Sequence, residues 1–503
     1  MEEIGKEKPL DVFLKDQPKG KFSRSSVKHP RTSPQRTEKQ KIRFHWTGHP
    51  FVDAGLVALL LIAGKTSPEE LTEKDIEKAI EFASKLYARK EWSSGYIHAM
   101  MLPNSGILMA NPSMAKKRTP EAIAQNLRGL LEEPEDPNAP ICEICGMRHS
   151  RSKPVYRSDF PLVGTGGVPN YFPSAKDGLN VCSYCLFLVQ FLPLVAYKVG
   201  RRVLVMHTYP YELMLELHGE ALNDVRKNFL ASNAKDFKRP ENFLFHLLGE
   251  LTRKTERDDI WANASITLYY FVNNNQGQEL DIIHVPTPVL RFIAYANVDD
   301  PTGWKRIVAM GWRKKPAEGE FEKYERSYAN EVYARLLAEE SILPYFIDVK
   351  NRRANAKWSL LSFYCSEVLD LDKEALEFIK DVGDRIVETL EKLPDNQLSR
   401  RVRELEKAEK LYQFEAFFVN LEKLRQRLGI EKPLMTFDEF ATVLTSYGED
   451  LNVSWRTVKH LLLFRVYEKL HDRLMKASEE AEEVGEEAEE NEEVGIFGMG
   501  VEE

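Results

Sequence analysis

The chain has few cysteines and no long hydrophobic run, and both absences narrow what it can be. Its 503 residues contain 5 cysteines, and one of them, Cys365, stands alone, which does not fit the disulfide framework of a secreted protein. No apolar run reaches the roughly 18 residues that a membrane-spanning helix needs. Glu2 and Glu3, with no apolar core after them, do not fit a signal peptide. We therefore expect a cytoplasmic protein with no membrane contact.

Positive charge is missing from the end of the chain. Residues 479–503 hold 12 Glu and no Lys or Arg, so leaving them out turns the net charge of −8 into +4. Residues 21–43 instead hold eight Lys or Arg against one Glu, among Ser, Pro and Thr. So little apolar surface predicts two disordered segments, a basic arm over 1–43 and an acidic tail over 479–503. The arm fits non-specific phosphate binding or a solvated linker equally well, and the tail fits a solubilising role.

Between these ends, the hydrophobic pattern predicts an α+β fold, a mixed helical and β body with a C-terminal α-helical bundle. Residues 44–140 should form an N-terminal helical part, with a helix from Pro50 to Ile62 and further helices over 68–89 and 120–132. In 187–359, strands are predicted for RRVLVMHTYP, ASITLYYFVNN and ELDIIHVPTPVLRFIAY, because β-branched and aromatic residues dominate these stretches. NNNQGQ should be the hairpin loop between the last two. Apolar residues spaced by three and four predict the helical bundle over 360–478.

The other four cysteines form two matched pairs, Cys142-x2-Cys145 and Cys182-x2-Cys185. Two such pairs can present four thiolates to one metal ion, and a tetrahedral set of soft sulfur ligands suits Zn²⁺. Four protein ligands leave no open position, so this zinc would be structural. Gly146 suits a turn that needs positive φ, and residues 141–186 are predicted to be an inserted zinc-binding module. A redox pair and buried free thiols are the alternatives.

Catalytic motifs are scarce. Gly164, Gly166 and Gly167 are not followed by the Lys-Ser/Thr of a phosphate loop. His49 and Asp53 lie one helical turn apart and could share a metal, but capping and packing suit them better because no third ligand is evident. No Ser-His-Asp set or carboxylate pair stands out, so we expect no enzyme.

Four stretches in one order resemble a known family. TGHPFVDAGLVAL, CEICG, FPLVGTGGVPNYFPSAKDGLNVCSYC and YYFVNNNQGQ together are similar to the CRISPR-associated CXXC-CXXC family, the large subunit of a type I-B (Tneap-subtype) Cascade. The likeness spans roughly residues 46–278 and is looser in the C-terminal helices. The basic arm and the Glu-rich tail depart from it.

The resemblance implies an antiviral surveillance complex that carries a crRNA and searches double-stranded target DNA. Base pairing with the guide would read the sequence, and protein would read only a short adjacent motif. A large subunit of this kind recognises the protospacer-adjacent motif, helps to open the duplex and helps to recruit the helicase-nuclease. Its partners would be the other Cascade subunits, the crRNA, the target DNA and that nuclease. Its C-terminal helices would contact the displaced strand.

Two groups of residues suit contact with nucleic acid. The amides of the predicted hairpin loop can pair with base edges; they are Asn273, Asn274, Asn275 and Gln276. Basic residues near tryptophans can hold phosphate while the aromatic faces stack on bases; they are Lys305, Arg306, Arg313, Lys314, Lys315, Arg352 and Arg353. The plain alternatives are an ordinary hairpin loop and a solvated basic face above core tryptophans.

The sequence therefore predicts a non-enzymatic, zinc-stabilised DNA-recognition subunit of a type I-B Cascade. One alternative is a stand-alone nucleic-acid-processing enzyme whose metal centre uses His49 and Asp53. Another is an RNA-processing or transcription-associated zinc protein.

Overall fold

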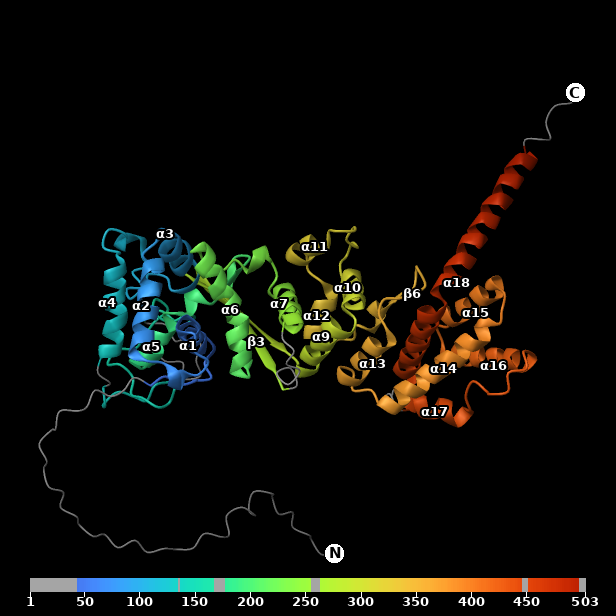
Figure 1. Cartoon of the computed structure of the whole chain (residues 1–503), viewed down its shortest axis with the longest axis horizontal. Coiled ribbons are helices and arrows are strands. Elements are labelled where there is room, and N and C mark those ends of the chain that lie inside the picture. Colours follow the sequence, from blue (N-terminus) through green and yellow to red (C-terminus); the bar gives the residue numbers. More distant parts are fainter. Residues whose placement is uncertain (1–42, 134–135, 167–176, 255–262, 446–450, 497–503) are drawn as a thin grey trace, which may run out of the picture. The chain divides into compact units, whose positions relative to one another are not determined.

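The computed structural model describes residues 43–133, 136–166, 177–254, 263–445 and 451–496. Within them, the fold is a mixture of helices and small antiparallel sheets, as the α+β pattern predicted (Figure 1). The basic arm over residues 1–42 and the last residues of the acidic tail, 497–503, lie outside the described residues.

The first helix is the centre of the N-terminal part. Helix α1 (Pro50–Ala63) starts next to Thr47 and His49, as predicted, and nearly all of its residues are buried. It packs against α2 (Glu73–Tyr87), α5 (Ser183–Val189), α6 (Tyr211–Asn228) and strand β2 (Arg202–Tyr209). A helix that is apolar on all sides has to be enclosed by other elements. The predicted helix over 68–89 is divided into η2 (Pro68–Glu70) and α2, because Thr72 caps α2 in a capping box with Asp75.

Four antiparallel strands form the main sheet in the order β1 (Tyr197–Val199), β2 (Arg202–Tyr209), β3 (Ser265–Asn274) and β4 (Gly277–Val285). Asn274 pairs with Gly277 at the end of the β3–β4 hairpin. The strand predicted to continue to Tyr295 is wrong beyond Val285, since helix α9 (Thr287–Asp299) follows. Proline explains the change, because Pro286 and Pro288 lack a donor for the ladder and fit the first turn of a helix.

The remaining elements before the bundle range from two-residue strands to the 15-residue helix α7. They are α3 (Lys90–Trp92), η3 (Ser93–Met101), η4 (Pro112–Met114), α4 (Pro120–Glu132), η5 (Leu192–Leu194), η6 (Ala234–Asp236), α7 (Pro240–Lys254), α10 (Pro301–Met310), α11 (Phe321–Ser327), α12 (Glu331–Leu337), η7 (Leu343–Phe346), β5 (Ile347–Asp348) and β6 (Arg353–Ala354). Strands β5 and β6 form a separate two-stranded sheet.

The C-terminal part is helical, as the spacing of apolar residues predicted. It contains α13 (Trp358–Glu367), α14 (Lys373–Glu391), α15 (Asp395–Glu406), α16 (Leu411–Arg427), α17 (Phe437–Thr445) and α18 (Leu451–Ile496). Helices α14 and α15 pack along α18, which also contacts β6. Helix α13 packs on α9, so the bundle shares a core with the preceding part of the chain.

Helix α18 continues into the Glu-rich segment and reaches Ile496. The sequence predicted disorder over residues 479–503, whereas the structure has helix up to Ile496. Glu and Ala are good helix formers, and a helix already started in the bundle needs no new nucleus to continue through them.

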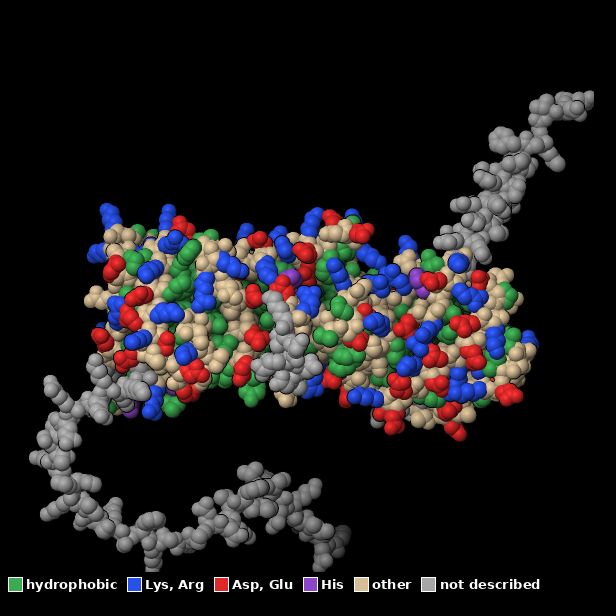
Figure 2. Space-filling view, viewed as in Figure 1, with side chains coloured by type: hydrophobic (Ala, Val, Ile, Leu, Met, Phe, Trp, Pro, Cys, Tyr) green, Lys and Arg blue, Asp and Glu red, His purple; other side chains and the backbone are tan. Residues whose placement is uncertain are grey.

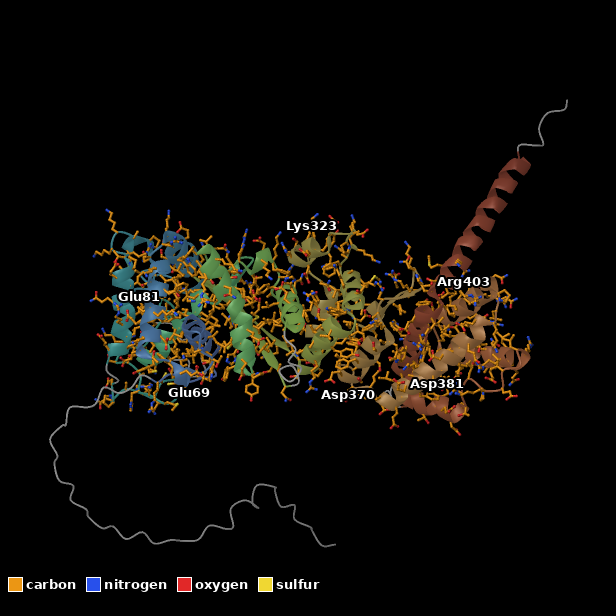
Figure 3. All side chains as sticks on the ribbon, in the orientation of Figure 1. Glu69, Glu81, Lys323, Asp370, Asp381 and Arg403 are labelled. Atoms are coloured by element: carbon orange, nitrogen blue, oxygen red, sulfur yellow. The ribbon has the colours of Figure 1, made fainter. Side chains whose placement is uncertain are left out.

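No described helix is long and apolar enough to cross a membrane. Lys and Arg are interspersed with Asp and Glu over the face seen in Figure 2. Asp381 on α14, labelled in Figure 3, pairs with Lys432, whose side chain is exposed, and with Arg385, whose side chain is mostly buried. An exposed pair such as Asp381–Lys432 contributes little to stability, roughly 0–1 kcal/mol.

Candidate metal centre and nucleic-acid interface

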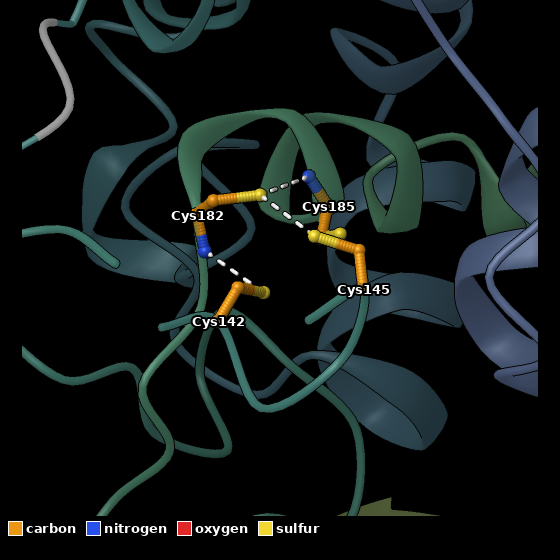
Figure 4. A group of neighbouring side chains, drawn as sticks. All are labelled: Cys142, Cys145, Cys182 and Cys185. Atoms are coloured by element: carbon orange, nitrogen blue, oxygen red, sulfur yellow. Dashed lines mark hydrogen bonds between the residues drawn. The ribbon is translucent and has the colours of Figure 1, made fainter. Parts of the chain in front are cut away.

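The four cysteines of the two pairs meet at one point in the fold (Figure 4). Their sulfur atoms all lie within 4.8 Å of one another, and Cys145 Sγ is 3.9 Å from Cys182 Sγ. Zn–S bonds of about 2.3 Å in a tetrahedron would place sulfurs about 3.8 Å apart. All four are free thiols rather than disulfides. The donor set therefore fits a tetrahedral metal ion with sulfur ligands.

A tight turn positions the first pair. The amide of Cys142 donates to Arg148 O at 2.7 Å, and the amide of Gly146 donates to Cys142 O at 2.9 Å. Gly146 has φ of 63°, as the sequence predicted, and a Cβ would strain this left-handed conformation. An antiparallel bridge between Ile141 and His149 closes the loop.

The start of a helix positions the second pair. Cys182 is the N-cap of α5, and its sulfur accepts a hydrogen bond from Cys185 N at 3.5 Å. The amide of Cys182 donates in turn to Cys142 Sγ at 3.3 Å. Backbone N–H groups directed at sulfur stabilise thiolates, the form that binds metal.

Electrostatics also favour a bound cation. Hydrogen bonding with Cys142 and the other thiols lowers the pKa of Cys145 far below its usual range and raises the pKa values of Cys182 and Cys185. Thiolates this close repel one another, so protons stay on some of the sulfurs when no cation is present. A divalent cation removes that repulsion, and metal binding would release the protons.

The segment between the cysteine pairs supports the β3–β4 hairpin. Asn273 is fully buried, and its amide donates to Met101 O and to Arg157 O, the latter at 3.2 Å. Gln278 donates to Val163 O at 3.0 Å and to the side-chain oxygen of Asn273 at 2.9 Å. Arg157 and Val163 both lie between the cysteine pairs, so the amides of Asn273 and Gln278 connect the hairpin to the segment that joins the two pairs.

These contacts change the prediction for the hairpin. The Asn273 side chain does not project from the turn, since it is buried in the interior of the protein. Asn274 Oδ1 accepts from Gln276 N at 2.8 Å and from Gly277 N at 3.0 Å, so its side chain closes the turn. Asn275 and Gln276 are exposed, and Asn104 donates to Asn275 Oδ1 at 3.1 Å. Within the described part of the chain, the Gln276 side chain has no hydrogen-bond partner. Two of the four predicted amides therefore remain available to a ligand.

The basic residues that were predicted to hold phosphate also divide into exposed and buried ones. The exposed ones are Lys305, Arg306, Arg313, Lys314 and Lys315. The neighbouring tryptophans, Trp304 and Trp312, are only 6% and 5% exposed, so the predicted stacking of their faces on bases is wrong. The structure instead has exposed basic residues beside buried tryptophans, which is the plain alternative named above.

Arg352 and Arg353 are less accessible than predicted. Arg352 is buried, 3.0 Å from Glu406 Oε1, and donates to Ser399 Oγ at 2.8 Å. It joins the β5–β6 turn to α15 and cannot also hold a phosphate. Arg353 is partly buried.

His49 and Asp53 have local structural roles. His49 Nδ1 accepts from Phe51 N at 3.3 Å, and burial lowers the pKa of His49 to about 4. Asp53 accepts from Thr47 N and Gly48 N at 2.8 and 2.9 Å. His207 Nε2 lies 3.2 Å from Asp53 Oδ2, a partner that β2 supplies and that sequence spacing could not reveal. Among the described residues, only the four cysteines come together as a metal-ligating group.

Residues 135–197 match the family described as CRISPR-associated protein (Cas_CXXC_CXXC). This stretch contains all four cysteines and helix α5. The match supports a CRISPR-associated protein with paired C-x2-C motifs. No curated protein and no solved structure matches the chain.

Proposed function

We propose that the chain is the large subunit of a type I-B Cascade, and that its β3–β4 hairpin reads the protospacer-adjacent motif. The family match over 135–197 supports a role in CRISPR defence. The observation that carries the finer assignment is the connection between the cysteine cluster and the hairpin through Asn273 and Gln278. A loop that reads bases has to be held rigidly, and this hairpin is held by a segment that a metal ion would fix.

In this function the metal is zinc, and its role is structural. Cys142, Cys145, Cys182 and Cys185 would hold it, and the set offers no open coordination position for chemistry. The chain itself would catalyse nothing. Cutting of DNA would belong to the helicase-nuclease that the complex recruits.

Contacts with DNA would divide into two classes. The exposed amides of Asn275 and Gln276 would meet base edges, which carry sequence information. The exposed cations from Lys305 to Lys315 would meet phosphates, which set position and affinity without reading sequence. Asn274 would act as a positioning residue, because its side chain shapes the turn.

Co-purification tests this function. A tagged chain expressed with the neighbouring CRISPR genes should bring down crRNA and the other Cascade subunits from the cytoplasm. A matched sample with Gln276→Ala should do the same, since Gln276 is exposed and is not needed for assembly. Recovery of the tagged chain alone, with no crRNA and no other subunit, would contradict the proposal. That result would favour a stand-alone nucleic-acid-processing enzyme or an RNA-associated zinc protein.

A further inference from the structure

Strand β4 forms the outer edge of the main sheet. Among the described residues, the strand order gives it only one neighbouring strand, β3. Helix α12 also contacts β4, yet residues 279–282 and 284 stay exposed. The strand contains no proline, no lysine and no break in its register, which are common ways in which proteins keep an edge from pairing with another strand.

The register of the hairpin shows which backbone groups of β4 point outward. Asn274 pairs with Gly277 across a two-residue loop, so these two residues exchange backbone hydrogen bonds. Bonded pairs alternate with non-bonded pairs along an antiparallel ladder, so every second residue of β4 directs its N–H and C=O away from β3. These residues are Gln278, Leu280, Ile282 and His284. No backbone partner for them is found in the part of the chain that the structure describes.

One face of this edge is apolar. Because side chains alternate between the two faces of a sheet, Leu280 and Ile282 lie on the same face, where they are 41% and 49% exposed. Phe51 of helix α1 covers the neighbouring strand on this face, since its ring centre is 4.9 Å from that of Phe271, the partner of Leu280 in the ladder. An additional strand beside β4 would cover the apolar surface that α1 leaves exposed.

The other face of the edge is acidic. The exposed side chains of Glu279 and Asp281 both pair with one cation, Arg202, whose guanidinium lies 2.6 Å from Asp281 Oδ2. In the described part of the chain, no other Lys or Arg pairs with these two carboxylates, so one negative charge is left unbalanced. Opposite charges on adjacent strands stabilise their pairing, whereas like charges directly opposite destabilise it. Lysine or arginine is therefore favoured on this face of an added strand.

The same charges disfavour two other occupants. If two copies of β4 paired in an antiparallel register centred on Leu280 or Asp281, carboxylates would lie opposite carboxylates. Nucleic acid phosphates would be repelled by the acidic face, and a nucleic acid has no ladder of N–H and C=O groups to match the edge.

We infer that the outer edge of β4 binds an extended segment of a partner protein as an additional strand, with apolar residues against Leu280 and Ile282 and basic residues against the two carboxylates. Main-chain hydrogen bonds would supply the affinity, and the alternation of apolar and basic side chains would supply the selectivity. The inference goes beyond the proposed function and does not depend on it, since it concerns the edge of the hairpin and leaves the amides at its tip exposed.

A synthetic peptide with the sequence Lys-Val-Lys-Ile-Lys-Val-Lys, with both ends blocked and a fluorescein label, tests the inference. Fluorescence anisotropy with the full chain gives its affinity. A peptide of the same composition and charge, Lys-Lys-Val-Ile-Val-Lys-Lys, is the matched control because its apolar and basic residues do not alternate. The alternating peptide should bind more tightly by roughly tenfold. Equal affinities would mean that charge alone attracts the peptides and would overturn the inference.

N-methylation of the alternating peptide tests the backbone ladder without changing the protein. In a strand, the N–H groups of alternate residues point to opposite sides, so only one set faces β4. Methylation of the Val and Ile amides removes the donors that face β4 in an antiparallel pairing, and methylation of the Lys amides removes those that face it in a parallel pairing. One methylated peptide should lose binding while the other keeps it. Equal effects of the two methylations would contradict strand addition.

A change in the chain gives a second test. Ile282→Pro removes one outward N–H, and proline is tolerated on the open side of an edge strand. It should weaken binding of the alternating peptide severalfold, with thermal unfolding as the check that the variant folds. Ile282→Val is the matched control, because valine is close to proline in size and keeps the N–H. Equal affinities of these two variants would overturn the inference, and the methylated peptides decide the matter if Ile282→Pro does not fold. None of these measurements involves crRNA, so the proposed function is tested separately.

Discussion

Asn273 shows how one side chain can support the hairpin that we propose as the reader of the motif. Its side-chain amide makes three hydrogen bonds: it donates to Met101 O and Arg157 O, and it accepts from Gln278. Met101 and Arg157 are far from Asn273 in sequence, and Arg157 belongs to the segment between the cysteine pairs. A substitution at Asn273 should therefore disturb both the hairpin and the segment between the cysteine pairs.

Asn273→Asp tests this role with almost no change of shape. A carboxylate cannot donate, so Met101 O and Arg157 O lose their donor and a charge is buried. We expect the free energy of unfolding to fall by roughly 3 kcal/mol, measured by urea denaturation. Asn275→Asp is the control, since Asn275 is exposed, and it should change stability by less than about 0.5 kcal/mol. Similar losses for both variants would show that Asn273 is not a special support.

The four cysteines of the cluster give a second prediction at this scale. Purified protein should contain zinc, and Cys142→Ser should lose it, because a serine oxygen is a poor ligand for this ion. Structural zinc can contribute on the order of 10 kcal/mol to local folding, so residues 142–185 should become sensitive to protease. Metal analysis and limited proteolysis measure both effects.

Cys365→Ala is the matched control for the metal prediction. Cys365 is also buried but lies outside the cluster, so this variant should keep its zinc. Full zinc content in Cys142→Ser would contradict a four-cysteine site.

At the scale of elements, helices α1 and α5 hold the cysteine cluster against the core. Gly55 of α1 lies so close to α5 that an added Cβ would be 1.9 Å from Leu188 O. Cys182 caps the start of α5 and Cys185 lies in its first turn, so the contact fixes the helix that presents the second cysteine pair. Only glycine permits two backbones to approach this closely.

Gly55→Ala should therefore destabilise the protein by roughly 3 kcal/mol, because backbone has to move to admit the methyl group. Gly129→Ala is the comparison, and its expected change in stability has the opposite sign. Gly129 is an exposed residue inside α4, and a Cβ there meets nothing within 4 Å. Alanine should raise stability there by about 0.5–1 kcal/mol. Thermal unfolding of both variants gives the test, and a harmless Gly55→Ala would contradict the close packing of α1 on α5.

Local patterns predicted much of the element structure. Helix α4 has the predicted bounds, and α1 starts at Pro50, since the cap and proline signals lie within a few residues of each helix start. The cysteine spacing predicted the cluster, because two C-x2-C turns can present four sulfurs to one tetrahedral ion. Strand β4 was predicted too long, because apolar content alone does not distinguish a strand from a helix start.

At the scale of the whole molecule, contacts between residues distant in sequence determine which of the predicted site residues are buried. The sequence does not reveal these contacts. Asn273 and Asn275 are both asparagines beside one turn, yet only the first meets partners from elsewhere in the chain and is buried. Arg352 was predicted to hold phosphate, but Glu406 and Ser399 from α15 enclose it. Burial of this kind depends on the packing of whole elements and leaves no local signal.

In the proposed function, the hairpin reads the motif while the basic face only holds the duplex. Duplexes with the correct motif and with scrambled motifs, bound to the assembled complex over a salt series, test it most directly. Gln276→Ala should reduce the preference for the correct motif by roughly 1–3 kcal/mol and spare affinity for scrambled duplexes. Arg313→Ala should weaken binding to every duplex alike and lower the salt slope by about one. If Gln276→Ala weakens all duplexes equally and leaves the preference unchanged, the hairpin does not read the motif.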